Sequence, residues 1–280
     1  MFTEDSTILS KNSRTQILLK GLLLTQKKVP AMGKLCVYAR DLLQDMFAPY
    51  DPEFAHINLN ADAYIKKINI LQKYFNSDLN IRQIVKSLLC ELGLTPEDTF
   101  SDRLVLRILA PSHTHQCNRA KKLLAHRDSW GSNIFSQINL WAPICPISVS
   151  RTMTIFPQYW KTPIANNSAN WDIDQLRRLT LAGKREKYPS VPNPTEKVCG
   201  IGDPVLLDPG DILAFAGAHL HESTISDTSR ARISFDFRIV SLFDVKAGIA
   251  SPNIDSYSNK KNFQWFNRFT DGTPMSIYLA

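Results

Sequence analysis

The chain has 280 residues, of which 44% are hydrophobic and 21% charged, and its formal net charge is +7. This balance excludes an intrinsically disordered chain, and the length allows a full core within one domain. The basic residues form neither a contiguous stripe nor a nucleic-acid-binding motif, so we expect no nucleic-acid partner.

The cysteines and the first residues bear on the compartment. The five cysteines are odd in number and form no C-x-x-C pair, which favours a reducing compartment. The opening MFTEDSTILS lacks the basic and apolar regions of a signal peptide. The early apolar stretch 17–24 is short and interrupted by Lys20, so it cannot span a bilayer. We therefore expect a cytoplasmic protein without a membrane partner.

Residues 1–98 are predicted to be helical. Apolar residues recur at three-to-four spacing over 15–24, 32–47 and 61–94, a pattern typical of amphipathic helices. Asn60 or Asp62 is a candidate N-cap for the third helix, and Gly93 falls near its end.

Residues 99–240 are predicted to form a core of short strands. The strand candidates, separated by turns rich in Pro, Gly and Asp, are 103–109, 135–142, 149–156, 205–207, 212–216 and 231–240. Many short strands at such spacing indicate a sandwich or a barrel. Within this core, residues 158–203 form a long polar insert with one short helix predicted at 172–181, which we interpret as a lid. The aromatic-rich tail 241–280 is expected to pack back onto the body, so the sequence predicts a single domain over 1–280.

His126-Arg127-Asp128 is the first sign of a metal site. On an extended backbone the imidazole and the carboxylate share one face, because strand side chains alternate. A non-haem Fe(II) site with two His and one carboxylate needs a second His and leaves a face open for chemistry. The motif alone is a weak signal in a chain with six histidines.

A predicted hairpin supplies the rest of the site. If residues 219–223 and 230–238 pair around a turn centred between Ser226 and Asp227, His221 lies directly opposite Arg232. An arginine beside a metal ligand requires an anion between them, and a dicarboxylate that binds both groups meets this requirement. His219 competes with His221 for the third ligand position, and a register shift of two residues would exchange Arg232 for Arg230.

These motifs carry a resemblance to a known family. His126-x-Asp128, His221-x-Ser223 and Arg232-x-Ser234, with Gly210-Asp211 before the distal His, resemble the phytanoyl-CoA dioxygenase-like family of Fe(II)/2-oxoglutarate-dependent oxygenases over roughly residues 100–240. The resemblance implies a mainly β fold with a double-stranded β-helix (jelly-roll) core and N-terminal α-helices packed on one sheet. It also implies that His126, Asp128 and His221 bind the catalytic iron, and that Arg232 and Ser234 bind 2-oxoglutarate.

The resemblance further implies a reaction. Such enzymes use O₂ to convert 2-oxoglutarate to succinate and CO₂ while they oxidise a small organic substrate. Because Asp128 is a carboxylate, hydroxylation, desaturation or cyclisation is favoured over halogenation. The basic insert matches nothing in the family and is either a solvated surface loop or a functional patch, which would favour an acidic or carrier-tethered substrate. The unmatched insert and the breadth of the family together favour a substrate from specialised-metabolite biosynthesis.

Further residues are candidates for the cavity wall. Gln137 and Asn139 share one face of a strand candidate and are predicted to donate hydrogen bonds to the cosubstrate. Arg107, Trp130 and Trp141 are predicted to contact the substrate. Two alternatives stay open: a cupin-type metalloenzyme that does not use 2-oxoglutarate, and a catalytically silent binding protein on the same scaffold.

Overall fold

The structure is a computed structural model that describes residues 2–4, 9–111, 123–184, 188–224 and 229–279. The centre of the turn predicted between Ser226 and Asp227 lies outside these residues. No helix in the described part of the chain is long and apolar enough to cross a membrane.

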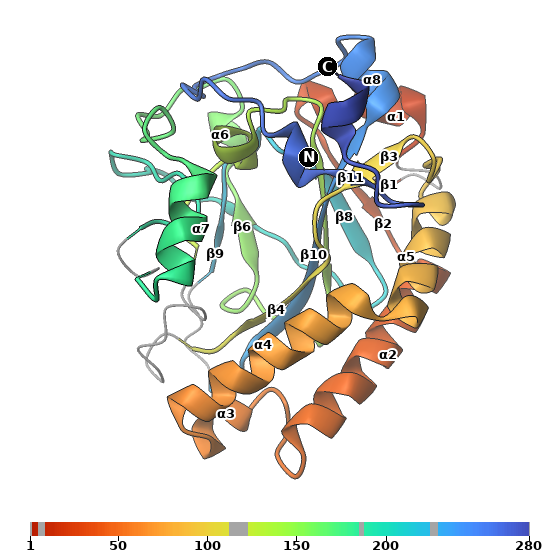
Figure 1. Cartoon of the computed structure of the whole chain (residues 1–280), viewed down its shortest axis with the longest axis vertical. Helices are drawn as coiled ribbons and strands as arrows, with labels where there is room; N and C mark the ends of the chain where they lie inside the picture. The colour runs from red at the N-terminus through yellow and green to blue at the C-terminus, as the bar shows by residue number, and fades with distance from the viewer. Residues whose placement is uncertain (1, 5–8, 112–122, 185–187, 225–228, 280) are drawn as a thin grey trace.

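Two β-sheets form the centre of the molecule (Figure 1). The large, eight-stranded sheet has the order β1-β2-β8-β5-β10-β3-β11, and β4 also pairs with β10. Its strands are β1 (Phe2–Glu4), β2 (Leu23–Gln26), β3 (Thr99–Ser101), β4 (Val105–Leu109), β5 (Ile138–Pro143), β8 (Ile212–Ala216), β10 (Arg232–Ser241) and β11 (Asn267–Arg268). The small sheet has the order β7-β6-β9, with β6 (Met153–Ile155), β7 (Asp203–Pro204) and β9 (His221–Ser223). All the described pairings are antiparallel except that of β1 with β2.

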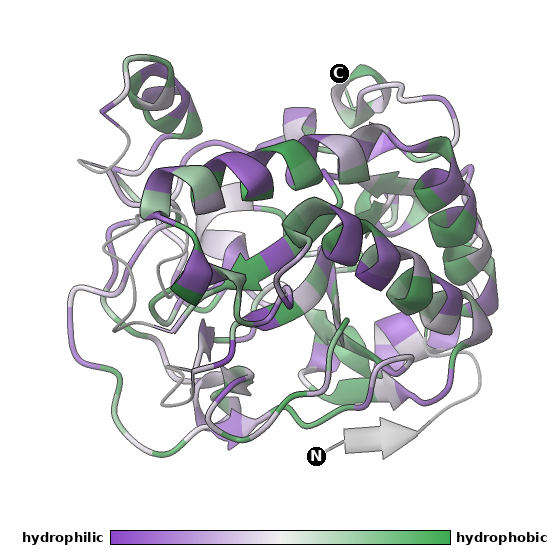
Figure 2. Cartoon of the chain, turned by 90° about the horizontal axis from the view of Figure 1, so that it is seen from below, coloured by the Kyte–Doolittle hydropathy of each residue, from purple (hydrophilic) through white to green (hydrophobic). Residues whose placement is uncertain are grey.

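Three helices cover one face of the large sheet, namely α2 (Pro30–Phe47), α4 (Ala61–Ser77) and α5 (Leu79–Glu91). The side chains of β10 that face them are apolar and join the helices in the main hydrophobic core: Ile233, Phe235, Phe237 and Ile239. Figure 2 shows hydrophobic and hydrophilic residues alternating around the helices, as expected when one face of a helix is buried. The structure thus combines antiparallel sheets with a full helical layer, and the prediction of a mainly β protein is not confirmed.

The alternate residues of β10 point to the opposite face. Arg232, Ser234, Asp236 and Arg238 follow each other at a spacing of two, between the apolar residues packed on the helices. The inner face of the large sheet is therefore polar along β10, and it is this face that carries the candidate site.

The remaining α-helices of the described chain are short and lie in the connections and the tail. They are α1 (Lys11–Gln16), α3 (Ala55–Asn58), α6 (Asp128–Ser132), α7 (Ile173–Leu181) and α8 (Leu242–Lys246). In Figure 1, α7 lies on the other side of the strands from α2, α4 and α5. It begins after Asp172, whose side chain accepts a hydrogen bond from the Asp174 amide, close to the predicted boundary.

Several predicted boundaries change for local reasons. The helix predicted over 15–24 holds only in its first part: α1 ends at Gln16 and a 3-10 turn covers Leu18–Lys20. Gly21 then adopts φ +101°, and the chain enters the sheet as β2. The segment 61–94 forms two helices, because Asp78 is extended and caps α5 through the Ile81 amide. The strand predicted at 205–207 is also wrong, since the observed β7 ends at Pro204.

The predicted hairpin between β9 and β10 is wrong as well. After β8 the chain leaves the large sheet, and β9 pairs with β6 in the small sheet, with His221 opposite Ile155. Strand β10 returns to the large sheet and pairs with β3, β4 and β5. Strands adjacent in sequence therefore belong to different sheets, and His221 and Arg232 reach the same cavity from opposite sides.

Candidate metal centre

Three side chains converge between the two sheets. One ligand atom from each of His126, Asp128 and His221 can be chosen such that all three lie within 4.8 Å of one another. His126 and His221 form an isolated antiparallel bridge, with reciprocal backbone N–H···O distances of 2.9 and 3.0 Å. Asp128 is the first residue of α6. Two segments that are far apart in sequence are thus joined at the ligands themselves.

The hydrogen bonds of the two imidazoles leave the same nitrogen available on each ring. Nδ1 lies 2.8 Å from the Leu124 carbonyl oxygen in His126 and 3.0 Å from the His219 carbonyl oxygen in His221. A carbonyl oxygen only accepts, so Nδ1 carries the proton and Nε2 presents its lone pair. The Nε2 atoms of His126 and His221 lie 3.9 and 4.0 Å from the Asp128 carboxylate oxygens. Both separations are below about 4.2 Å, the largest that two ligands of one ion can have at bond lengths near 2.1 Å.

The ionisation states also suit a cation. Burial, reinforced by the neighbouring His221, lowers the pKa of His126 to about 3. Burial alone would raise the pKa of Asp128, but the Arg238 guanidinium and the two histidines hold it down at about 2. At neutral pH the site therefore presents a neutral imidazole at His126 and a carboxylate at Asp128, the forms that bind metal ions.

A second set of side chains fixes the Asp128 carboxylate. Asn139 donates to one oxygen at 2.6 Å, and Arg238 donates to the other at 3.3 Å. Gln137 in turn donates to the Asn139 carbonyl oxygen at 2.8 Å, and Asp102 pairs with Arg238 at 2.6 Å. Gln137 and Asn139, predicted as contacts of the cosubstrate, thus lie behind a metal ligand. Arg238 and Asp102 were not predicted to lie at this site, although Arg238 shares the alternation of Arg232.

Arg232 is a buried cation with unused donors. It is 4% exposed, and its two terminal nitrogens donate to the Thr152 carbonyl and, at 3.3 Å, to the Ser223 hydroxyl. Its Nε and the hydroxyl of Ser234, two residues along the same face, have no partner within the described chain. Burial lowers the pKa of Arg232 to about 10, although Asp236 opposes the shift. A buried guanidinium with a free donor favours an anionic ligand. Arg232 lines the cavity, whereas Ser234 is fully buried and does not.

The alternatives from the sequence lie elsewhere. His219 packs its ring on Trp160 at 4.5 Å and directs Nε2 to the Gly21 carbonyl oxygen at 3.1 Å, so it is not part of the ligand cluster. Arg230 is exposed, whereas Arg232 is buried. Of the two histidines, only His221 lies in the ligand cluster, and of the two arginines, only Arg232 is buried at the cavity.

One cavity of about 1040 Å³ contains the three metal-ligand candidates and Arg232. Arg107 and Trp141 line it, and Arg107 forms an ion pair with Asp236. Trp130 does not line it, because its indole is fully buried and donates to Asp255 at 2.6 Å. The insert and the tail contribute to the wall through Trp171, Leu176, Arg177, Trp265 and Arg268. The volume is at the upper end for small-molecule sites, which leaves room for a substrate beside a cosubstrate.

No family model and no curated protein sequence matches the chain. Among solved structures, EvdO2 from Micromonospora carbonacea var. aurantiaca is 12% identical with a TM-score of 0.48, over 85% of this chain and 94% of that chain. The non-heme alpha ketoglutarate dependent carbocyclase SnoK from nogalamycin biosynthesis is 10% identical with a TM-score of 0.44, over 94% and 98%. EvdMO1 is 15% identical with a TM-score of 0.36, over 58% of this chain, which spans only 32% of EvdMO1. These values are too low to assign a family, so the function is inferred from the site itself.

Proposed function

We propose that this chain is an Fe(II)- and 2-oxoglutarate-dependent oxygenase, on a double-stranded β-helix scaffold, that hydroxylates, desaturates or cyclises a small organic substrate. His126, Asp128 and His221 would hold the iron, which matches the two-His, one-carboxylate set of non-haem iron oxygenases. With O₂, iron and 2-oxoglutarate would supply oxidising power coupled to release of succinate and CO₂.

The observation that carries the proposal is Arg232. A metal site alone would fit a cupin-type enzyme, but a buried guanidinium without a carboxylate partner among the described residues lines the same cavity. Arg232 offers a planar donor pair to the far carboxylate of 2-oxoglutarate. Ser234, the other residue proposed to bind this carboxylate, lies on the same strand face but outside the cavity lining. Asn139 and Arg238 would keep the Asp128 carboxylate oriented during turnover.

Arginines on the cavity wall suggest the substrate class. Arg82, Arg103 and Arg177 line the cavity from three different parts of the chain and are exposed to solvent. Of the four acidic residues of the described chain that line the cavity, Asp128 is a metal-ligand candidate, and Asp102 and Asp236 pair with Arg238 and Arg107; the fourth is Glu222. We therefore propose that the substrate carries an anionic group, either its own or that of a carrier.

Release of succinate from 2-oxoglutarate tests the proposed activity. The assay contains Fe(II), ascorbate and O₂, and compares the wild type with His126→Ala and Asp128→Ala. We expect succinate above the level of both variants, and an increase when a true substrate is present. Metal-dependent turnover of a substrate without 2-oxoglutarate would support the cupin-type alternative. Metal binding with no succinate under any condition would support a silent binding protein.

A further inference from the structure

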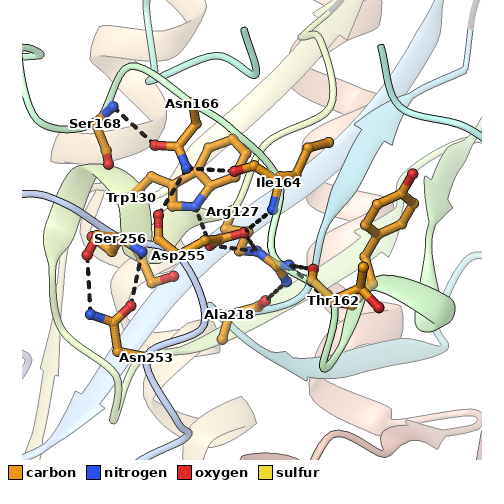
Figure 3. Close-up of polar contacts among 12 residues, drawn as sticks. Arg127, Trp130, Thr162, Ile164, Asn166, Ser168, Ala218, Asn253, Asp255 and Ser256 are labelled. Atoms are coloured by element: carbon orange, nitrogen blue, oxygen red, sulfur yellow. Dashed lines mark hydrogen bonds and ion pairs between the residues drawn. The ribbon is translucent and has the colours of Figure 1, made fainter. Parts of the chain in front are cut away.

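Arg127, the residue between the first two ligand candidates, is buried in a polar cluster (Figure 3). Its side chain is 1% exposed. Its guanidinium donates to three backbone carbonyl oxygens, those of Ala218 at 2.5 Å, Tyr159 at 2.8 Å and Thr162 at 3.1 Å. The guanidinium therefore binds backbone from two other parts of the chain.

Asp255 of the tail completes the cluster. Its carboxylate accepts from Arg127 Nε at 3.1 Å, from the Trp130 indole at 2.6 Å and from the Ile164 amide at 3.0 Å. Both ionised side chains of the pair are 1% exposed, so the pair is fully withdrawn from water. A buried pair of this kind holds its geometry because breaking it would leave a charge unpaired in the interior.

The cluster connects both segments that carry the metal ligands. Arg127 lies in the first segment, between His126 and Asp128. Ala218, whose carbonyl Arg127 binds, lies three residues before His221 in the second segment. A second hydrogen bond, from the Ser129 amide to the Gly217 carbonyl oxygen at 3.0 Å, joins the same two segments. The insert and the tail join the same cluster through Ile164 and Asp255.

We propose that Arg127 and Asp255 are positioning residues for the metal site. The pair holds the His126–Asp128 segment against the segment leading to His221. Through Ile164 and Asp255, it also connects the insert and the tail to these two segments. This inference rests on the proposed metal site, although not on the use of 2-oxoglutarate. Groups that hydrogen-bond directly to metal ligands contribute about 10- to 100-fold to metal affinity in proteins. Arg127 and Asp255 act on the backbone that carries the ligands, and we take the same range as their expected effect.

Metal binding to the folded, substrate-free protein tests the role without any activity assay. Mn(II) affinity is measured by electron paramagnetic resonance, and the Co(II) absorption spectrum reports the ligand geometry. The key variant is the double substitution Arg127→Gln with Asp255→Asn, which removes both charges and so leaves no unpaired charge inside. Arg127→Lys keeps the charge but cannot reach all four partners of the guanidinium.

The chain offers a matched control in Arg14 and Asp244. This second buried Arg–Asp pair, at 2.7 Å, joins the N-terminal region to α8, and neither residue lines the cavity. We expect the double variant and Arg127→Lys to bind Mn(II) about 10- to 100-fold more weakly, with a changed Co(II) spectrum. The corresponding Arg14→Gln and Asp244→Asn variant should bind as the wild type does.

The outcomes separate the two proposals. Folded Arg127 and Asp255 variants that bind Mn(II) within twofold of the wild type would overturn the positioning role and leave the pair as a purely structural one. A wild-type protein that binds neither Mn(II) nor Co(II) would instead overturn the proposed metal site, and the positioning role with it. Equal weakening by the Arg14 and Asp244 control would also contradict the positioning role, because it would show a general effect of losing a buried pair.

Discussion

Asn139 donates a hydrogen bond to one carboxylate oxygen of Asp128 at 2.6 Å, and Gln137 donates one to the side-chain oxygen of Asn139 at 2.8 Å. All three side chains are oriented by this series of hydrogen bonds, which begins at Gln137, directly before β5, and ends at a metal-ligand candidate. The remaining Asp128 oxygen meets Arg238. The carboxylate is therefore held at both oxygens before any ion binds.

Asn139→Leu should weaken metal binding while keeping the fold. Leucine has a similar volume but cannot donate to Asp128, so the carboxylate loses the shorter of its two hydrogen bonds, and we expect a 10- to 100-fold higher Kd for Mn(II). Asn139→Asp places a second carboxylate against the first, so it should destabilise the metal-free protein. The loss in the free energy of unfolding should exceed the loss in the free energy of Mn(II) binding. An Asn139→Leu variant with wild-type Mn(II) affinity would contradict this role.

Arg232→Met should affect 2-oxoglutarate more than the metal. Loss of a charge-assisted contact to a carboxylate weakens binding by about 1.5–3 kcal/mol, which is roughly 10- to 150-fold in Kd. Calorimetric titration of 2-oxoglutarate into the Mn(II)-loaded protein measures the change. Arg232→Lys should recover only part of the affinity, because an ammonium lacks the planar pair of donors. Unchanged 2-oxoglutarate binding in Arg232→Met would remove the main support for this cosubstrate.

The metal-free protein should lose stability as the pH falls below 6.5. The pKa of His126 is about 3 in the folded protein against an ordinary 6.5, so between these values the unfolded chain binds a proton that the folded chain does not. Each such proton makes the unfolding free energy fall by about 1.4 kcal/mol per pH unit as the pH decreases. His219, with a pKa of about 4, acts in the same direction, whereas Asp128 acts only below its ordinary 3.8.

Urea unfolding between pH 4.5 and 6 measures this dependence. We expect His126→Gln to reduce the slope by about one proton, because glutamine does not titrate. If His126→Gln keeps the wild-type slope of unfolding free energy against pH, His126 is not buried in its neutral form.

Arg177 and Arg178 test the anionic substrate class. They are adjacent, exposed residues of α7, and only Arg177 lines the cavity. For a substrate identified by its stimulation of succinate release, Arg177→Gln should raise KM several-fold and leave kcat nearly unchanged, while Arg178→Gln should resemble the wild type. Equal effects of the two substitutions would point to the overall charge of the helix and not to a contact within the cavity.

Several elements lie where the spacing of apolar residues predicted them. α2 and α7 begin and end within two residues of their predicted bounds, and β8 coincides with the predicted 212–216. The segment 15–24 was predicted to be a helix because its apolar residues recur at helical spacing. The end of the segment instead belongs to β2, which pairs with β8 in the large sheet. Local propensity contains no information on such a distant partner.

The three ligand candidates were chosen from the motifs, but the way in which they come together in space was not predicted. Placing Arg232 near His221 through a hairpin relied on the assumption that strands adjacent in sequence pair with each other. The structure assigns them to different sheets, and Arg232 instead reaches the Ser223 hydroxyl across the cavity. The Arg127–Asp255 pair could not be predicted either, because nothing in the sequence shows that a carboxylate of the tail pairs with the middle residue of the H-x-D motif.

Titration of the metal-free protein with Mn(II), with the affinity and number of bound ions determined by electron paramagnetic resonance, tests the central claim most directly. Three ligand atoms within 4.8 Å predict one tight ion per chain in the wild type. His126→Ala and His221→Ala should each abolish tight binding, whereas His219→Gln, outside the ligand cluster, should retain it. Undiminished binding in both alanine variants, or none in the wild type, would show that these side chains do not form a metal site.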